Sequence, residues 1–185
     1  FYEEIGMNKT TYLPLNKFEK SEIMPTENDH VLRRQLLHGY VHDPGAAMLG
    51  GVCGHAGIFS TANDLAKLMQ MYLNGGEYGG TKYFNPETIE LFTTSPFLDN
   101  DNRRALGFDK PQMDYSKSGP TCQCVSEKSF GHSGFTGTIA WADPDEQIIY
   151  IFLSNRIHPD QDNNKLLQMD VRTDIQQVIY DAIIR

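Results

Sequence analysis

Two short apolar runs joined by a four-residue turn constrain the fold of this chain more than any other part of it. The runs are Thr138–Ala142 and Gln147–Asn155, and the turn between them reads Asp-Pro-Asp-Glu. β-branched and aromatic residues favour strands, whereas Asp and Pro favour turns. The small-residue segment Gly131–Gly137 comes directly before this hairpin. The sequence therefore predicts three antiparallel strands, with His132 on the first of them.

A helix is expected over Thr61–Leu73. Thr61 can cap its first turn, Asp64 completes a variant of the capping box, and Asn74-Gly75-Gly76 ends the helix. Five apolar residues of this segment fall on one helical face. They are Leu65, Leu68, Met69, Tyr72 and Leu73.

Two further helices are expected downstream. One begins at Asn85 with Pro86 in its first turn, and its Ile89 and Phe92 should face inward. The other runs to the C-terminus and should cover one face of the sheet, because no other partner for its apolar stripe is evident. That stripe consists of Leu167, Val171, Ile175, Val178, Ile179 and Ala182. The expected fold class is α+β, an antiparallel sheet with helices and a C-terminal helix packed on the sheet.

The other segments are expected to be irregular. Residues 39–60 are rich in Gly and Ala, which favours tight turns and close backbone packing over a long regular element. Residues 99–128 are polar and loop-like, and Tyr2–Ile5 should be the tail of a helix that Gly6 ends.

Length and charge exclude some classes of protein. The chain has 185 residues, which fits one domain, and a formal net charge of −8. Nucleic-acid binding requires clustered Lys and Arg, but only the pairs Arg33-Arg34 and Arg103-Arg104 occur. No apolar stretch approaches the ~20 residues needed to span a bilayer. We therefore expect neither a nucleic-acid partner nor a membrane span.

The cysteines and histidines do not predict a bonded framework or a metal site. Cys53, Cys122 and Cys124 are an odd set, and a spacing of two is seldom suited to a disulfide, so three free thiols are expected. His38, His42, Asp43 and His55 could suggest a metal site, but Gly39 and Pro44 disfavour the helix that would align the first two. Loop roles are favoured, and we expect no metal and no cofactor.

Three segments together resemble a known family. They are Gly54–Leu65, Val41-His42-Asp43 followed by Gly50-Gly51, and His132-Ser133-Gly134. The combination is similar to the serine β-lactamase-like family, which includes penicillin-binding proteins, class C β-lactamases and related esterases. The family uses Ser-x-x-Lys, a Tyr- or Ser-containing triplet ending in Asn, and Lys-Thr-Gly or a His-x-Gly variant. His132-Ser133-Gly134 matches the third motif.

The resemblance implies a role for each residue of this strand. His132 would be the catalytic residue at the cationic motif position, able to bond a catalytic hydroxyl or to carry charge at mildly acidic pH. Ser133, Gly134 and Phe135 would bind substrate and the oxyanion, with the Phe135 amide as one donor. His42, Asp43, Phe108 and Tyr115 would border the cleft, although the two aromatic residues could equally be core plugs. Without the resemblance, His132 could simply be a strand-end histidine.

The first two family motifs are not found in this chain. No Ser is followed three residues later by Lys, and Tyr72-Leu73-Asn74 lies on the apolar face and end of a predicted helix. The resemblance therefore implies that residues 1–185 are the C-terminal portion of one β-lactamase-like serine hydrolase domain, without its nucleophile. We expect the chain alone to be inactive, and either to be less stable than the longer protein or to self-associate through uncovered apolar surface.

The resemblance also implies a function for the longer protein. It would be a serine hydrolase that acts through an acyl-enzyme on a peptide, ester or lactam carbonyl, related to the cell wall and located in the periplasm or secreted. Its partner would be a small-molecule or peptide substrate resembling peptidoglycan. The alternatives are a non-catalytic module that binds peptidoglycan or a partner and is attached to a glycoside hydrolase, and a purely structural domain.

Overall fold

The computed structural model describes residues 1–100 and 102–183. Its helices are α1 (Pro44–Met48), α2 (Ala62–Leu73), α3 (Pro86–Thr93), α4 (Lys165–Gln168) and α5 (Val171–Asp181), with 3-10 turns at Pro14–Asn16, Lys20–Glu22 and Leu98–Asn100. Its strands are β1 (Pro25–Asp29), β2 (Gln35–His38), β3 (Glu77–Tyr78), β4 (Thr81–Lys82), β5 (Phe130–Ser133), β6 (Ile139–Asp143) and β7 (Ile148–Phe152).

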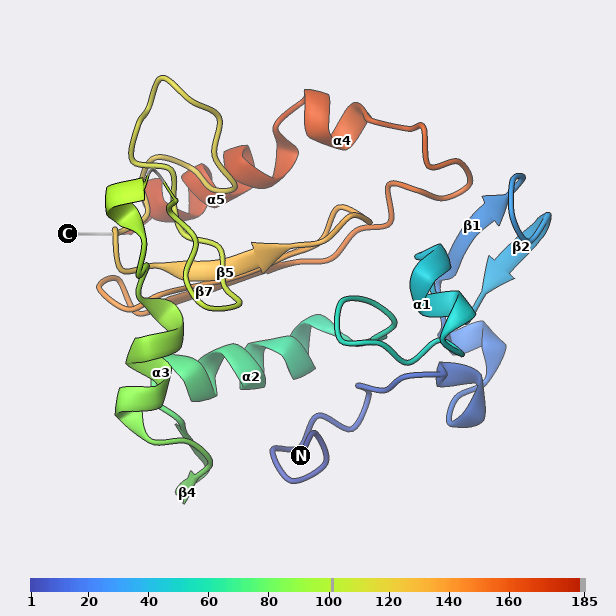
Figure 1. Ribbon diagram of the computed structural model, residues 1–185, viewed down its shortest axis with the longest axis horizontal. Coiled ribbons are helices and arrows are strands. Elements are labelled where there is room, and N and C mark those ends of the chain that lie inside the picture. Colours follow the sequence, from blue (N-terminus) through green and yellow to red (C-terminus); the bar gives the residue numbers. More distant parts are fainter. Residues whose placement is uncertain (101, 184–185) are drawn as a thin grey trace.

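An antiparallel sheet of order β5-β6-β7 lies between α5 on one face and α2 on the other (Figure 1). Trp141 at its centre pairs with Gly131 on one side and with Tyr150 on the other. The three predicted strands are thus confirmed, as is the terminal helix that covers one face. The mixture of helices and small antiparallel sheets confirms the α+β class.

The sheet alternates its side chains between two apolar clusters, as the two-residue period of a strand requires. Ala140, Ala142 and Ile149 face α2, where Met69 is buried among them. Trp141 and Tyr150 face the other way, toward α5, and the Tyr150 hydroxyl donates to the Arg172 carbonyl of that helix at 2.9 Å. The sheet is therefore covered on both faces by the helices that flank it.

Helix α2 begins and ends as predicted, but its acidic residue has another partner. Thr61 Oγ1 accepts a hydrogen bond from the Asp64 amide at 3.3 Å, and the helix ends before Gly75 and Gly76, both with positive φ. The Asp64 carboxylate accepts from the Lys9 amide at 2.7 Å. The expected capping box is therefore wrong, because this carboxylate ties the N-terminal segment to the helix.

Helix α3 starts at Pro86 after Asn85, as predicted, and Ile89 is buried. Phe92, in contrast, is 45 % exposed, so its expected inward orientation is wrong. This short helix crosses the end of α2 (Figure 1), and Ile89 is its buried residue.

The C-terminal helical segment is broken, and its buried face differs from the predicted stripe. Asp170, at φ 49°, separates α4 from α5. The residues of α5 that are fully buried are Gln176 and Tyr180, whereas Val178 is 66 % exposed. Both buried residues are hydrogen-bonded: Gln176 Oε1 accepts from the Cys122 amide at 3.1 Å, and the Tyr180 hydroxyl donates to Asp143 at 2.8 Å. Polar anchors, which hydrophobic periodicity cannot reveal, therefore orient this helix.

The N-terminal segment contains turns and a hairpin that the sequence analysis did not predict. Tyr2–Ile5 forms turns instead of a helix tail, and the Met7 amide donates to the Tyr2 carbonyl at 2.8 Å. Strands β1 and β2 pair as an antiparallel hairpin. The Gly-rich segment holds only the short helix α1, consistent with the expected absence of a long element.

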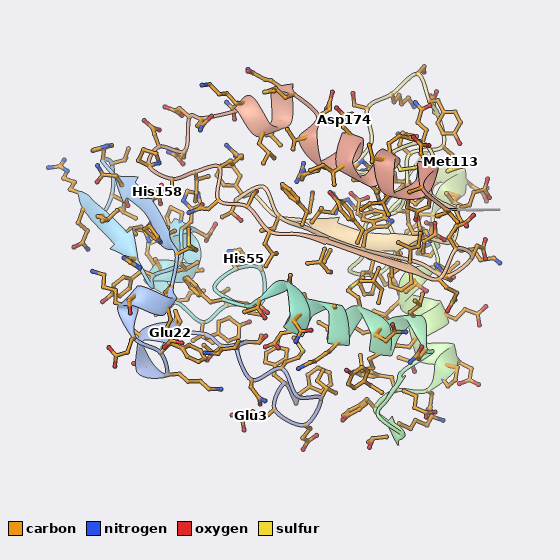
Figure 2. The ribbon with its side chains drawn as sticks, turned by 180° about the vertical axis from the view of Figure 1, so that it is seen from behind. Glu3, Glu22, His55, Met113, His158 and Asp174 are labelled. Atoms are coloured by element: carbon orange, nitrogen blue, oxygen red, sulfur yellow. A yellow bond between two sulfur atoms is a disulfide. The ribbon has the colours of Figure 1, made fainter. Side chains whose placement is uncertain are left out.

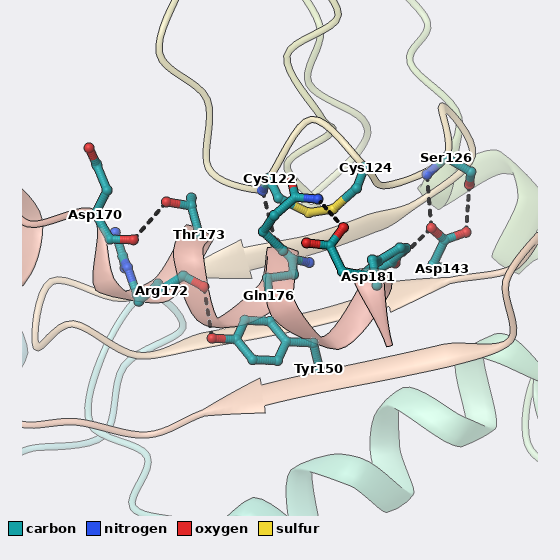
Figure 3. The surroundings of a disulfide bond; sticks show 12 residues. Cys122, Cys124, Ser126, Asp143, Tyr150, Asp170, Arg172, Thr173, Gln176 and Asp181 are labelled. Carbon is teal, nitrogen blue, oxygen red and sulfur yellow. Dashed lines mark hydrogen bonds between the residues drawn. A yellow bond between two sulfur atoms is a disulfide. The ribbon is translucent and has the colours of Figure 1, made fainter. Parts of the chain in front are cut away.

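Cys122 and Cys124 form a disulfide, contrary to the expectation of three free thiols (Figure 3). Their Cα atoms are 5.3 Å apart, a separation that a disulfide can bridge. The loop is held in a tight turn because the Cys122 amide bonds α5 and the Ser126 amide bonds Asp143 of β6. Cys53 is left as the free cysteine.

Two surfaces bear on the expected self-association, which stays a prediction. The outer edge of β7 has no partner strand within residues 1–100 and 102–183. Helix α5 also leaves Ile175, Val178 and Ile179 exposed.

None of the described helices combines the length and apolarity needed to cross a membrane.

Candidate active site

The site is built on β5, an edge strand of the sheet. Its outer side meets Asp109 in an isolated bridge, in which the Asp109 amide donates to the Gly131 carbonyl at 2.7 Å and the Gly131 amide donates to the Asp109 carbonyl at 3.2 Å. Beyond this bridge, no strand of the described chain pairs with the outer edge of His132 and Ser133. Such an edge can receive an extended peptide as an added strand.

His132 is exposed on β5 and makes two hydrogen bonds that define its tautomer. Its Nδ1 lies 2.7 Å from the Ser133 carbonyl, and its Nε2 lies 3.0 Å from Arg104 Nη1. A carbonyl and a guanidinium act only as acceptor and donor, respectively. A ring with its hydrogen on Nδ1 satisfies both contacts, and Arg104 brings a positive charge next to the motif.

Arg104 contacts the candidate residue His132, although the sequence analysis noted it only as part of a basic pair. The buried carboxylate of Asp109 holds both members of that pair, with Oδ2 3.0 Å from Arg103 Nη2 and 3.6 Å from Arg104 Nη2. Since 28 positions separate Arg104 from His132, no local motif could have indicated this contact.

The turn after β5 places the Phe135 ring between the side chains of His42 and Arg156. The Gly134 amide donates to the Thr138 carbonyl at 2.8 Å, which closes the turn. The Phe135 ring stacks on the His42 ring with centroids 4.9 Å apart, and the Arg156 guanidinium lies 4.5 Å from the Phe135 centroid. Arg156 Nε also donates to the Phe135 carbonyl at 2.9 Å, so both the ring and the backbone of Phe135 are held.

His42 is positioned by the β1–β2 hairpin. Its Nδ1 lies 2.6 Å from the buried carboxylate of Glu27 on β1. Arg33 donates to the His42 carbonyl at 2.6 Å and, through Nε, to Asp29 at 2.7 Å. The Arg33 hydrogen bond holds the pKa of the Asp29 carboxyl well below its usual range. The hairpin therefore acts as a support for the side chain that stacks on Phe135.

The remaining candidate residues occupy three different environments. Asp43 caps α1 by accepting from the Ala46 amide at 2.7 Å. Phe108 packs edge to face against Tyr72 and Phe130 in the cluster between β5 and α2. It therefore contributes to the hydrophobic core, which is one of the two roles considered for it. Tyr115 lies exposed in the loop that follows Pro111.

No group of three or more His, Cys, Asp or Glu side chains suited to a metal ion occurs within the described ranges, 1–100 and 102–183. His38, one of the four residues considered for a metal, instead places Nε2 2.5 Å from the Ile23 carbonyl.

Replacing Gly131 by alanine is expected to destabilise the protein by about 2 kcal/mol, the cost of overpacking a filled site. A Cβ at Gly131 would lie 2.2 Å from the Ala140 carbonyl oxygen and 2.8 Å from Trp141 Cα, and neither backbone atom can move without displacing β6. Urea unfolding would measure the change. Gly54→Ala is the matched control, since a Cβ there meets nothing within 4 Å. Equal stability of the two variants would contradict this account of β5.

Comparisons with known proteins identify the relatives of this chain. The family model described as "Beta-lactamase" matches residues 4–172. A relative from Escherichia coli (strain K12), named "Putative D-alanyl-D-alanine carboxypeptidase", is 36 % identical over 170 residues, which are 85 % of this chain and 38 % of the relative. A protein of the same name from Salmonella newport is 36 % identical over 178 residues, 89 % of this chain and 40 % of its own length.

Two solved structures are similar over part of the chain. A β-lactamase from Mycobacterium bovis is 26 % identical, with a TM-score of 0.47, over 69 % of this chain and 44 % of its own. A penicillin-binding protein homologue from Caulobacter crescentus is 26 % identical, with a TM-score of 0.43, over 54 % and 27 %. The chain thus spans about two fifths of the curated relatives' length, 38 % and 40 %. On the family model and these carboxypeptidase-named relatives, the chain belongs to the β-lactamase family.

Proposed function

We propose that this chain supplies the substrate-binding wall of a serine acyl-transfer site in a longer protein, and that the substrate is a peptide of the cell wall. The observation that carries the proposal is the exposed His132 on an edge strand, with the Arg104 guanidinium 3.0 Å from its ring. The names of the relatives add the substrate class, a peptide that ends in D-alanyl-D-alanine.

Each part of the wall has a chemical task in this proposal. The free edge of β5 would align the peptide as an added strand. The Phe135 amide, on a turn held by Arg156, would donate to the oxyanion of the tetrahedral intermediate. Arg104 has a side chain that is 52 % exposed and could pair with the terminal carboxylate of the peptide, because a guanidinium binds carboxylates through two parallel hydrogen bonds.

The attacking hydroxyl and its base would come from outside these 185 residues. No Ser in this chain has a Lys three positions later, and a Ser hydroxyl without an adjacent base is a poor nucleophile. The protein would work in the periplasm or outside the cell, where its substrate is found. The isolated chain would not turn over substrate.

Covalent labelling tests the proposal directly. The full-length polypeptide that contains these residues should react with a fluorescent penicillin and with a fluorophosphonate, whereas the isolated chain should react with neither. Intact-mass and peptide mass spectrometry would locate the label on a Ser outside residues 1–185. A full-length protein that retains its fold, binds peptidoglycan and takes no label would instead favour the non-catalytic binding module. Labelling of the isolated chain would contradict the assignment of the nucleophile.

A further inference from the structure

Three side chains meet in the loop around α1. They are linked in the order nucleophile, base and an acid that orients the base. Cys53 Sγ lies 3.1 Å from His55 Nδ1, and His55 Nε2 lies 3.0 Å from Asp43 Oδ1. Figure 2 shows His55 on the loop that leads into α2. None of the three belongs to the His132 strand, and the proposed acyl transfer does not use them.

The hydrogen bonds assign the His55 tautomer. An ionised carboxylate only accepts, so Nε2 carries the hydrogen that is shared with Asp43, and the lone pair of Nδ1 points at the Cys53 thiol. The Ala46 amide and His55 together hold the pKa of the Asp43 carboxyl below its usual value, so Asp43 is ionised at neutral pH. The arrangement is that of a thiol with a proton acceptor, which a third group orients.

The surrounding backbone holds this set in place while leaving it open to solvent. Tyr12 donates its hydroxyl hydrogen to the Cys53 carbonyl at 3.0 Å, and the Gly51 amide donates to the Ala46 carbonyl at 2.8 Å. Gly57 can approach this turn only because it lacks a side chain: a Cβ there would lie 2.5 Å from the Gly51 carbonyl oxygen. The His55 side chain is 58 % exposed and Cys53 is half-buried, so a small reagent can approach the pair from the His55 side.

We propose that Cys53 is a modification site, a thiol activated by His55 and Asp43 that exchanges with small disulfides. As the sulfur attacks, its proton moves to His55 Nδ1 and a new bond joins Cys53 to one sulfur of the reagent. The original S–S bond breaks, and the other half leaves as a thiolate with the electron pair. Cys53 is oxidised to a mixed disulfide, and the leaving half becomes a thiol when it takes the proton from His55.

The other cysteines favour a clean measurement. Cys122 and Cys124 are bonded to each other, so the unreduced native protein offers Cys53 as its free thiol. The probe is 2,2′-dithiodipyridine, whose released thiopyridone is followed by absorbance at neutral pH. Native Cys53 should react at least about tenfold faster than the same cysteine in the urea-unfolded chain, since a positioned base typically contributes 100-fold or more. Peptide mass spectrometry should find the adduct on Cys53.

Matched variants separate activation from simple exposure. His55→Asn should reduce the native rate at least about tenfold, because the proton acceptor is lost. Asp43→Asn keeps an oxygen for the α1 cap and should reduce the rate by about threefold, since exposed charges act weakly through water. His30→Asn, which changes an exposed histidine in the turn after β1, should leave the rate unchanged. Circular dichroism of each variant checks that the fold is retained.

The proposal is overturned if folded His55→Asn reacts as fast as the unaltered chain. It is equally overturned if native and unfolded Cys53 react at the same rate, or if the adduct lies on another residue. These results do not depend on acyl transfer, so they leave the proposed function to its own test.

Discussion

Asp143→Ala is expected to lower the free energy of unfolding by about 3–4 kcal/mol, because hydrogen bonds to a buried charged group contribute about 1.5–3 kcal/mol each. Asp143 ends β6 and is 1 % exposed. Its carboxylate accepts from the Ser126 amide at 2.8 Å, the Ser126 hydroxyl at 2.6 Å and the Tyr180 hydroxyl at 2.8 Å (Figure 3). One side chain thus joins the disulfide loop, the sheet and α5. Urea unfolding at neutral pH measures the loss.

The same carboxylate predicts a dependence of stability on pH. Burial raises the pKa of Asp143, but the hydrogen bonds from Ser126, Tyr180 and the Glu146 amide outweigh burial and leave the pKa below its usual value. The pKa of Asp143 is thus lower in the folded chain than in the unfolded chain. Ionised Asp143 therefore contributes its full stabilisation above about pH 4, and this contribution is lost as the pH falls through the folded-state pKa. Asp143→Asn should therefore lose less stability than the unaltered chain between neutral pH and about pH 3.

Asp145→Ala is the control for this prediction. Asp145 lies in the same turn, but its carboxylate is 47 % exposed and pairs with the exposed Lys128 at 2.9 Å. Exposed ion pairs contribute about 0–1 kcal/mol, so this variant should be nearly as stable as the unaltered chain. A loss of less than about 1 kcal/mol for Asp143→Ala would show that the three hydrogen bonds do not organise the α5 face.

His132→Ala in the full-length protein is expected to lower kcat/KM for a D-alanyl-D-alanine peptide by about 100-fold, the size of one lost acid–base or oxyanion contact. The expectation rests on the proposed function. The ring accepts from Arg104 Nη1 at 3.0 Å, so its removal also frees the guanidinium from the strand. If the ring acts on the reacting atoms, the loss should fall mainly on kcat. If it acts mainly by holding Arg104 for the substrate carboxylate, KM should rise instead.

His30→Ala and Arg104→Gln complete this experiment. His30 is exposed after β1 and should be dispensable for turnover. Arg104→Gln should raise KM for a peptide with a free carboxylate, but not for the same peptide as an amide. Unchanged kinetics in His132→Ala, with serine labelling intact, would remove this strand from the mechanism while leaving the acyl-enzyme assignment in place.

The strand that carries His132 could be predicted because its pattern is local in sequence. His132, Ser133, Gly134 and Phe135 are consecutive, and their resemblance to a family motif identified one strand and its turn. Arg104, Glu27 and Arg156 could not be found in this way. Each reaches the site from another segment, and an Arg or Glu alone carries no sign of its partner.

The limits of α2 could be predicted from the sequence, whereas the buried face of α5 could not. Thr61 and Gly75 act on their own neighbours, so the limits of α2 could be predicted correctly. The face that α5 turns inward is decided by Gln176 and Tyr180, whose partners Cys122 and Asp143 lie 54 and 37 positions away. The Cys122–Cys124 disulfide also depends on residues distant in sequence, because its turn is held by hydrogen bonds to α5 and β6.

The sequence by itself determined the antiparallel strands, the limits of α2, the start of α3 and the family to which the motif strand belongs. Each depends on neighbours within a few residues, where hydrophobic period, capping and turn chemistry act. Only the tertiary structure decided which face of α5 is buried, which cysteines are bonded, and that Arg104 lies against His132. Those outcomes depend on polar groups that meet across long stretches of chain, and the pairing of such groups has no periodicity in the sequence.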